Sequence, residues 1–368
     1  METSVPRCLV VGGTGGVGAL IAELLLRETN VRVTVAGRSQ ERVAAMVAQL
    51  RAFASDRVAG CVVDLAHDDL DPVLRGYTLV VQVTTATAAI PRLADACIRM
   101  GVDYVDCSTQ HVLASRAAEV RDAGRCFIVQ AGFHPGLPAA FVRAAASSFD
   151  RYDAAVVAMA MRARFRTEES AVEIVDMLAA GLPEIFADGH WRASTYRDAH
   201  LVDFGAPFGT QRCYPIDMPE LRTVPESLGL RKVMTVVGGF GGPTDLLLMA
   251  LMPIAMIAYR IRPGWGRRTF ARWFVRCANR FLRGAPGIVF LVDAEGQVQG
   301  RARRLRIRAE HADPFAFTAI PVIACIRQYL AQHQSGLFAM GNFVDPEPLL
   351  ADMERMGIRI DRTWSDRS

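Results

Sequence analysis

A glycine-rich run near the start of the chain is the first group of residues whose spacing predicts chemistry. It follows the short apolar stretch 8–11 and precedes a helical pattern in which residues 20–25 carry leucines and an isoleucine on one side. The spacing Gly13-x-Gly15-x-x-Gly18 between a strand and a helix is typical of a dinucleotide-binding loop. The first glycine allows a tight turn, the second lets the backbone approach the pyrophosphate, and the third permits close helix–strand packing. The predicted cofactor-binding residues of this loop are Gly13, Thr14, Gly15, Gly16, Val17 and Gly18.

The end of the second predicted strand indicates which dinucleotide is bound. Sheets that prefer NAD place an acidic residue about 20 positions after the glycines, where it holds the ribose hydroxyls. Here the sequence reads Ala36-Gly37-Arg38-Ser39, with no carboxylate before Glu41. Arg38 can meet a 2′-phosphate and Ser39 can add a hydroxyl donor, so the pattern favours NADP over NAD. The alternative for Arg38 is a solvated loop arginine.

The carboxyl ends of the other predicted strands supply the remaining candidates, because ligands bind there in open parallel sheets. Hydride transfer needs a proton source beside the nicotinamide, and His111 and His134 are the titratable groups near this edge. Each histidine has the alternative of a structural hydrogen bond, and water can supply the proton instead. Asp64 is a candidate for the adenine edge or a turn residue. The further cofactor-binding candidates are Thr84, Thr85 and Ser108.

Composition excludes several kinds of catalysis. Lys232 is the one lysine, and position 228 is leucine, so the Tyr-x-x-x-Lys mechanism of short-chain reductases is excluded. The eight cysteines include no C-x-x-C pair, and no H-E-x-x-H motif is present, so we expect no metal site. Scattered free cysteines suit the reducing cytoplasm, where we expect the protein to lie.

The elements that must position these residues alternate between strand and helix. The predicted strands are residues 8–11, 31–36, 58–64, 79–83, 104–106 and 127–130, and one predicted helix covers 88–100. This alternation indicates an α/β fold with a parallel sheet covered by helices on both faces. The 368 residues, 51% of them hydrophobic, are enough for about two domains. The net charge of +4 is too small to indicate a nucleic-acid partner.

The second half of the chain contains polar residues with less specific patterns. Tyr214, Asp217 and Glu220 lie in a strand-and-turn context, where they line a substrate cleft or belong to surface loops. Three arginines alternate along one predicted strand and so share a face, which suits either anion binding or a solvated sheet face. These are Arg162, Arg164 and Arg166.

The basic excess of the chain is confined to the segment 246–283. No acidic residue lies between Asp245 and Asp293, whereas eight arginines do. An uncharged run, 246–259, is too short to cross a ~30 Å hydrocarbon core as a helix. A helical pattern follows, with a basic stripe and an apolar stripe. The basic stripe is Arg268, Arg272, Arg276 and Arg280, and the apolar stripe is Phe270, Phe274, Cys277 and Phe281. Three interpretations stay open: a peripheral contact with an anionic membrane, a lid over a lipophilic substrate, or a core helix with solvated arginines.

Five stretches together resemble the saccharopine dehydrogenase-like oxidoreductases. They are residues 10–18, 36–39, 96–106, 131–138 with its Gly-Phe-His-Pro-Gly turn, and 336–358. The resemblance implies an NADP-binding Rossmann domain with a doubly wound parallel sheet. It also implies a second α/β domain of mixed sheet that covers the substrate and often pairs two subunits. The implied activity is NADPH-dependent hydride transfer to a C=N, C=C or C=O bond of a small-molecule substrate, with a lipophilic one among the candidates.

The resemblance sets the expected domain boundaries. Residues 1–131 are expected to form the NADP-binding domain, on which the C-terminal segment 341–368 packs back, and 132–340 to form the substrate and homodimerisation domain. Two departures weaken the transfer of an amino-acid substrate. Residues 84–87 read Thr-Thr-Ala-Thr where many members have Gly-Pro-aromatic, and His134 stands where some amine-forming members have an acid. A noncatalytic NADP-binding or membrane-docking protein on the same fold is the alternative function.

Overall fold

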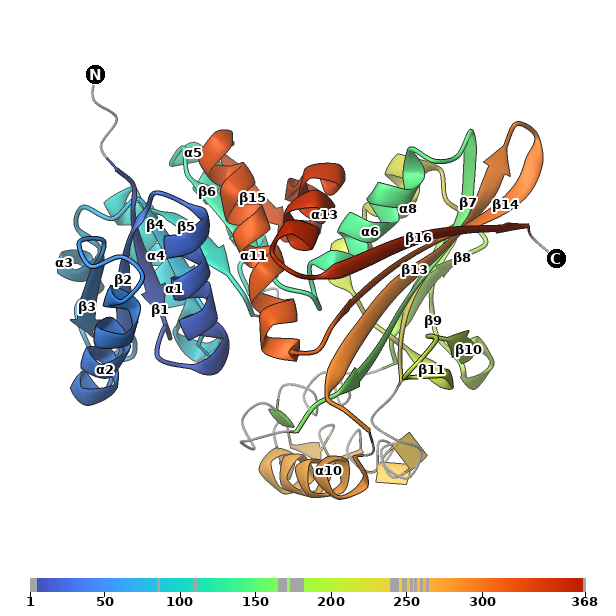
Figure 1. Ribbon diagram of the computed structural model, residues 1–368, viewed down its shortest axis with the longest axis horizontal. Coiled ribbons are helices and arrows are strands. Elements are labelled where there is room, and N and C mark those ends of the chain that lie inside the picture. Colours follow the sequence, from blue (N-terminus) through green and yellow to red (C-terminus); the bar gives the residue numbers. More distant parts are fainter. Residues whose placement is uncertain are drawn as a thin grey trace. The chain divides into compact units, whose positions relative to one another are not determined.

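The computed structural model divides into two compact units, which are described separately (Figure 1). The first comprises residues 1–140 and 315–356, and the second comprises residues 141–314 and 357–368. The structure describes residues 5–84, 87–108, 112–164, 171–172, 182–238, 245–246, 250–251, 254, 257–258, 261–262, 265–282 and 284–366.

A seven-stranded sheet with the order β15-β6-β5-β4-β1-β2-β3 forms the centre of the first unit. Every neighbouring pair in this sheet is parallel. The strands are β1 (Arg7–Val11), β2 (Arg32–Gly37), β3 (Val58–Val62), β4 (Leu79–Gln82), β5 (Asp103–Asp106), β6 (Cys126–Val129) and β15 (Gly336–Ala339). The strand order reverses between β1 and β4, which is where such sheets bind ligands. The predicted doubly wound parallel sheet is therefore confirmed.

Helices connect the strands of the first unit and cover the sheet. They are α1 (Gly16–Glu28), α2 (Gln40–Arg51), α3 (Leu70–Leu74), α4 (Ile90–Met100), α5 (Ala117–Asp122), α11 (Pro314–Ala331), α12 (Met340–Phe343) and α13 (Pro346–Arg355). Helix α6 (Leu137–Ala146) begins in the first unit and continues into the second. Two short 3₁₀ turns, η1 (Thr87–Ala89) and η2 (Ala114–Arg116), precede α4 and α5. Leu9 and Val11 of β1 share a buried cluster with Leu93 and Cys97 of α4. Alternation along the strand and a 3.6-residue period along the helix place these apolar side chains in one core.

The unit boundaries differ from the predicted domains, because the chain returns to the first unit earlier than expected. Segment 315–340 belongs to the first unit, where the Tyr329 hydroxyl of α11 donates a 2.7 Å hydrogen bond to the buried Asp103 carboxylate of β5. β15 then extends the sheet beside β6. Residues 341–356 lie in the first unit as expected, whereas 357–368 belong to the second, since β16 (Arg359–Asp366) pairs with β14. α11 is the one helix in the described part of the chain long and apolar enough to span a membrane, and 56% of that stretch is buried as core.

The second unit contains a nine-stranded mixed sheet, whose main path is β10-β11-β12-β7-β13-β14-β16. Its strands are β7 (Arg151–Arg162), β8 (Glu184–Ala187), β9 (His190–Ala193), β10 (His200–Asp203), β11 (Thr210–Ile216), β12 (Lys232–Gly238), β13 (Gly287–Val298), β14 (Arg301–His311) and β16. β12 and β7 are parallel, whereas β7, β13, β14 and β16 are antiparallel neighbours. The unit also contains η3 (Tyr196–Asp198), η4 (Pro219–Leu221), α8 (Val224–Leu228) and α10 (Arg267–Phe281). The expected second domain of mixed sheet is thus present.

Candidate cofactor and active site

The glycine loop joins β1 to α1 with a backbone that side chains would obstruct. Gly12 has φ +86°, a left-handed conformation, so the tight turn falls on Gly12 rather than on the predicted Gly13. A Cβ atom at Gly12 would lie 2.8 Å from Cγ2 of Thr84, which follows β4. A Cβ atom at Gly18 would lie 2.8 Å from the carbonyl carbon of Gly12, so the third glycine permits the close approach of α1 to the strand end.

The N-terminus of α1 is open to an anion. Gly15 is its N-cap residue and carries no side chain to cap it, and the first turn contains no acidic residue. The first backbone N–H groups of a helix have no partner within it, and the helix dipole attracts negative charge there. A Cβ atom at Gly15 would meet only the Gly12 carbonyl oxygen, at 3.3 Å. These features fit the pyrophosphate of a dinucleotide.

The end of β2 presents cations rather than a carboxylate. Arg38 is exposed, and Ser39 caps α2, its hydroxyl oxygen accepting the Arg42 backbone N–H at 3.3 Å. The Ser39 hydroxyl proton remains able to donate. The guanidinium of Arg42 donates to the Thr14 carbonyl oxygen at 3.0 Å, so this arginine connects α2 to the glycine loop. Arg42 was not among the predicted residues, and its position four residues after Arg38 is the signal in the sequence that points to it.

Asp64, after β3, is used within its own turn. Its carboxylate accepts the Ala66 backbone N–H at 3.0 Å and lies 3.1 Å from Nδ1 of His67. These two contacts, with a smaller effect of Arg38, hold the pKa of the Asp64 carboxyl below its usual range. The structure therefore places Asp64 as a turn residue, while its contact with adenine stays a prediction.

Polar turns follow β4 and β5, and the one after β4 approaches the glycine loop through Thr84. The buried Gln82 side chain, which was not among the predicted site residues, accepts the Thr84 backbone N–H at 3.0 Å and so sets the turn after β4. The buried Ser108 donates both its backbone N–H and its hydroxyl to Asp106, at 2.7 and 3.1 Å. Burial raises the pKa of the Asp106 carboxyl to about 6, against the lowering effect of these bonds. Thr85 lies outside the described residues.

His134 lies in the loop after β6, which the Phe133–Gly136 bridge closes. Its Nε2 atom is buried and has no hydrogen-bond partner among the described residues. Burial lowers the pKa of His134 to about 4, so the imidazole is neutral at pH 7. The other predicted catalytic residue, His111, lies outside the described residues.

Two further side chains near the loops bear on the chemistry. The exposed ring of Phe315, at the start of α11, would lie 3.5 Å from a Cβ atom at Gly16, so an aromatic face adjoins the glycine loop. No local motif in the sequence points to it, because it is 299 positions away. Burial raises the pKa of the Cys107 thiol, which excludes a reactive thiolate there. The described residues contain no group of metal ligands.

Two of the polar residues predicted in the second unit, Arg162 and Asp217, have structural partners. Arg162 donates to the Pro207 carbonyl oxygen at 3.0 Å and stacks over the Phe208 ring. Arg164 lies beyond the end of β7, and Arg166 lies outside the described residues. Arg222 pairs with Asp217 at 2.8 Å. Tyr214 is half-buried in β11, and Glu220 is buried in η4. None of these positions by itself defines a substrate site.

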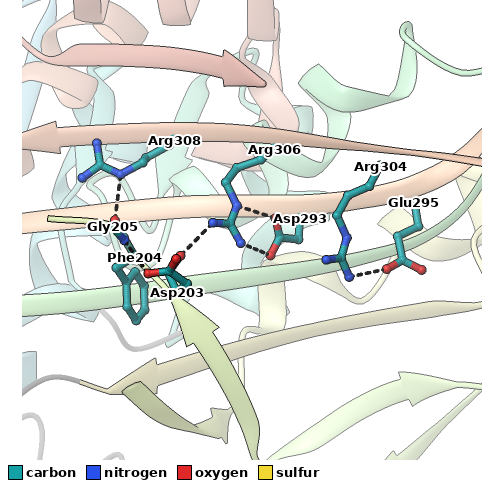
Figure 2. A network of polar contacts seen from close by, with 8 residues as sticks. All are labelled: Asp203, Phe204, Gly205, Asp293, Glu295, Arg304, Arg306 and Arg308. Atoms are coloured by element: carbon teal, nitrogen blue, oxygen red, sulfur yellow. Dashed lines mark hydrogen bonds and ion pairs between the residues drawn. The ribbon is translucent and has the colours of Figure 1, made fainter. Parts of the chain in front are cut away.

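A ladder of charged pairs crosses one face of this sheet instead (Figure 2). Arg306 of β14 holds Asp293 of β13 through two 2.7 Å bonds and donates to the Asp203 carbonyl oxygen at 2.7 Å. Arg304 pairs with Glu295 at 2.7 Å. Each pair joins residues that face one another in the strand register, so the ladder stabilises the sheet.

The strand order, the glycine loop and the open helix N-terminus together define a Rossmann-type dinucleotide-binding protein with a second, mixed-sheet domain. Residues 8–128 match the family model described as the saccharopine dehydrogenase NADP-binding domain. NADP is therefore the cofactor of this domain, and the resemblance seen in the sequence is confirmed.

Solved structures extend this likeness to the whole fold. Apo saccharopine dehydrogenase (L-Glu forming) from Saccharomyces cerevisiae is 15% identical, with a TM-score of 0.69 over 98% of this chain and 100% of that one. Two local matches have low scores. Yeast methylglyoxal/isovaleraldehyde reductase Gre2 with NADPH is 21% identical, with a TM-score of 0.23 over 27% of this chain and 36% of that one. Pen from Bacillus thuringiensis is 16% identical, with a TM-score of 0.28 over 35% and 51%. The comparison with curated proteins found no match.

Proposed function

We propose that the chain is an NADPH-dependent oxidoreductase that transfers a hydride to a C=N, C=C or C=O bond of a small molecule. The observation that carries this proposal is the uncapped N-terminus of α1 at the switch point between β1 and β4, with Arg38 and Arg42 at the neighbouring strand end. A helix N-terminus suits the pyrophosphate, and the arginines suit a 2′-phosphate.

The bound cofactor supplies the hydride, and the chain must orient the acceptor and allow a proton to reach it. His134 is the described titratable residue beyond β6 whose ring nitrogen lacks a partner. With a pKa of about 4, about one imidazole in a thousand is protonated at pH 7. We infer that His134 acts as a neutral hydrogen-bonding residue toward the nicotinamide or the acceptor. The proton then comes from water or through this imidazole from water.

The substrate class has two candidates, an amino-acid-derived imine and a lipophilic enone or ketone. The name of the yeast relative supports the first. Two departures weaken the first and so favour the second: His134 stands where some amine-forming members have an acid, and residues 84–87 read Thr-Thr-Ala-Thr where many members have Gly-Pro-aromatic. The eight cysteines are free, which supports a reducing, cytoplasmic location. A homodimer stays a prediction that sedimentation of the purified chain tests.

The decisive experiment separates cofactor binding from turnover. NADPH binding is measured by its fluorescence, and oxidation of NADPH is then followed at 340 nm with imines, enones, ketones and a metabolite extract. We expect binding and substrate-dependent oxidation. Binding without oxidation across the whole panel would instead support the noncatalytic alternative, and the absence of binding would contradict both.

A further inference from the structure

The segment 246–281 exposes a concentration of large apolar side chains. Sixteen such side chains are exposed in the described parts of the chain, and seven of them fall in this one stretch. They are Leu246, Ile254, Ile257, Ile261, Trp265, Trp273 and Phe281. Single exposed apolar residues are ordinary, whereas seven within one segment of the chain point to a segment that meets another apolar phase. We call the described residues of 246–281 the apolar–basic surface.

Helix α10 belongs to this surface and has two distinct faces. Ala271, Phe274 and Ala278 are buried in a cluster with Ala171. This buried face differs from the predicted apolar stripe: Phe270 and Cys277 are only half-buried, and Phe281 is exposed. The reason is the rotation of α10 about its axis, which turns Ala271, Phe274 and Ala278 toward the neighbouring Ala171 and leaves Phe281 outside the contact. The helix therefore has its core contact already.

The opposite face of α10 combines an exposed tryptophan with unneutralised arginines. Trp273 is 54% exposed, and helical spacing places it beside Arg276 and Arg280. Arg268, Arg276 and Arg280 make no ion pair or hydrogen bond with the described residues. Elsewhere in this unit arginines face carboxylates, as in the Arg306–Asp293 pair. No carboxylate lies between Asp245 and Asp293 to neutralise the helix.

This combination favours one occupant. A second copy of the surface would bring like charges together, which opposes self-association. A nucleic acid would match the arginines but would leave the exposed isoleucines without an apolar partner. An anionic bilayer surface matches both, because its headgroups attract arginine while tryptophan and aliphatic side chains enter the acyl boundary. At 15 residues α10 is about 22 Å long, too short to span the hydrocarbon core.

We propose that the apolar–basic surface docks the protein peripherally on anionic phospholipid membranes, with α10 lying in the plane of the interface. Arg268, Arg276 and Arg280 contact the headgroups, and Trp273 inserts at the boundary. The docking does not depend on the proposed enzymatic activity, since none of these residues belongs to the nucleotide site.

The test is sedimentation of the full chain with vesicles of phosphatidylcholine alone or with 30% phosphatidylglycerol. We expect binding to the anionic vesicles at low salt and its loss as salt approaches about 0.5 M, because surface charges are then screened. The triple variant Arg268→Gln, Arg276→Gln, Arg280→Gln should bind on the order of 100-fold more weakly. Addition of anionic vesicles should shift tryptophan emission to shorter wavelength, and Trp273→Phe should remove part of that shift.

A matched control removes the same charge from the first unit. Arg51, Arg75 and Arg121 are also exposed, so changing these three to Gln should leave vesicle binding within about twofold if the site rather than net charge matters. NADPH binding by each variant reports that the fold is intact. Equal binding by the α10 triple variant and the parent overturns the proposal, as does a parent chain that ignores anionic vesicles. A dimer that Trp273→Ser dissociates also overturns it, because a second copy then covers the surface.

Discussion

The backbone of Gly18 passes so close to the carbonyl group of Gly12 that a Cβ atom at position 18 would lie 2.8 Å from the carbonyl carbon. Real Cβ atoms do not approach this closely, so α1 can begin beside β1 only with glycine at this position. The same proximity directs the first N–H groups of α1 toward the anion site.

The two glycines at the start of α1 should therefore respond differently to alanine. Gly18→Ala should displace α1, lower the free energy of unfolding of the first unit by about 1–3 kcal/mol or more, and weaken NADPH binding. Gly15→Ala places its methyl group 3.3 Å from the Gly12 carbonyl oxygen alone, so it should cost less stability than Gly18→Ala but still weaken NADPH binding by obstructing the pyrophosphate. Thermal unfolding and fluorescence titration measure the two effects. Equal stability of both variants would contradict the proposed packing role of Gly18.

Cofactor preference should depend on Arg38. NADPH should bind more tightly than NADH, and Arg38→Ala should erase most of that preference, since one charge-assisted phosphate contact contributes ~1.5–3 kcal/mol, or about ten- to hundredfold in affinity. Arg51→Ala, at the far end of α2, is the matched control and should leave the preference unchanged. Titrations that give the parent equal affinities for both cofactors would refute this prediction.

His134 should matter for turnover more than for cofactor affinity. With a responsive substrate, His134→Ala should lower kcat about 100-fold or more while NADPH affinity stays near that of the parent. His134→Gln keeps a hydrogen-bonding group and should recover part of the loss. The imidazole is already neutral above its pKa of about 4. Its titration should therefore cause no fall in kcat between pH 5 and 7. Near-normal turnover by His134→Ala would leave this residue a structural role only.

Two buried groups should make opposing contributions to the pH dependence of the free energy of unfolding. The His134 pKa falls from 6.5 to about 4 on folding, so the unfolded chain binds more protons in that window and stability from this group is lost as pH falls below 6.5. The Asp106 pKa rises from 3.8 to about 6, so its contribution is full below 3.8 and is lost as pH rises toward 6. Each slope is at most about 1.4 kcal/mol per pH unit.

Unfolding temperatures at pH 4.5 and 6.5 separate these two contributions. Between these values, His134→Gln should gain less stability with rising pH than the parent, and Asp106→Asn should gain more. Identical pH dependence of the parent and both variants would show that neither group titrates across this range.

The arginine ladder predicts a graded loss of stability in the second unit. Arg306→Met should cost about 2 kcal/mol, because it leaves Asp293, whose side chain is 14% exposed, without its charged partner. Arg304→Met should cost less than about 1 kcal/mol, since the Arg304 side chain is 46% exposed and its pair is solvated. Urea unfolding of each variant, followed by a signal from the second unit, measures the two losses in the free energy of unfolding. A larger effect at Arg304 would contradict this ranking.

Local patterns in the sequence predicted much of the structure of the nucleotide-binding unit. Strand–helix alternation predicted the parallel sheet, and the glycine spacing with Arg38 and Ser39 predicted an NADP-binding loop, because both depend on residues close together in the chain. The glycine motif did not predict the left-handed turn at Gly12, because the motif specifies the spacing of glycines and not their φ angles.

Long-range packing decided the rest. Phe315 adjoins Gly16, and Tyr329 of α11 binds Asp103, only because the chain returns to the first unit after forming most of the second. Arg42 meets the Thr14 carbonyl only once α2 packs beside the glycine loop. Burial, which has no local signature, neutralises His134 and raises the pKa of Asp106. On α10 the sequence determined the stripe of arginines, whereas contact with Ala171 decided which apolar side chains are buried and which, like Trp273, remain exposed.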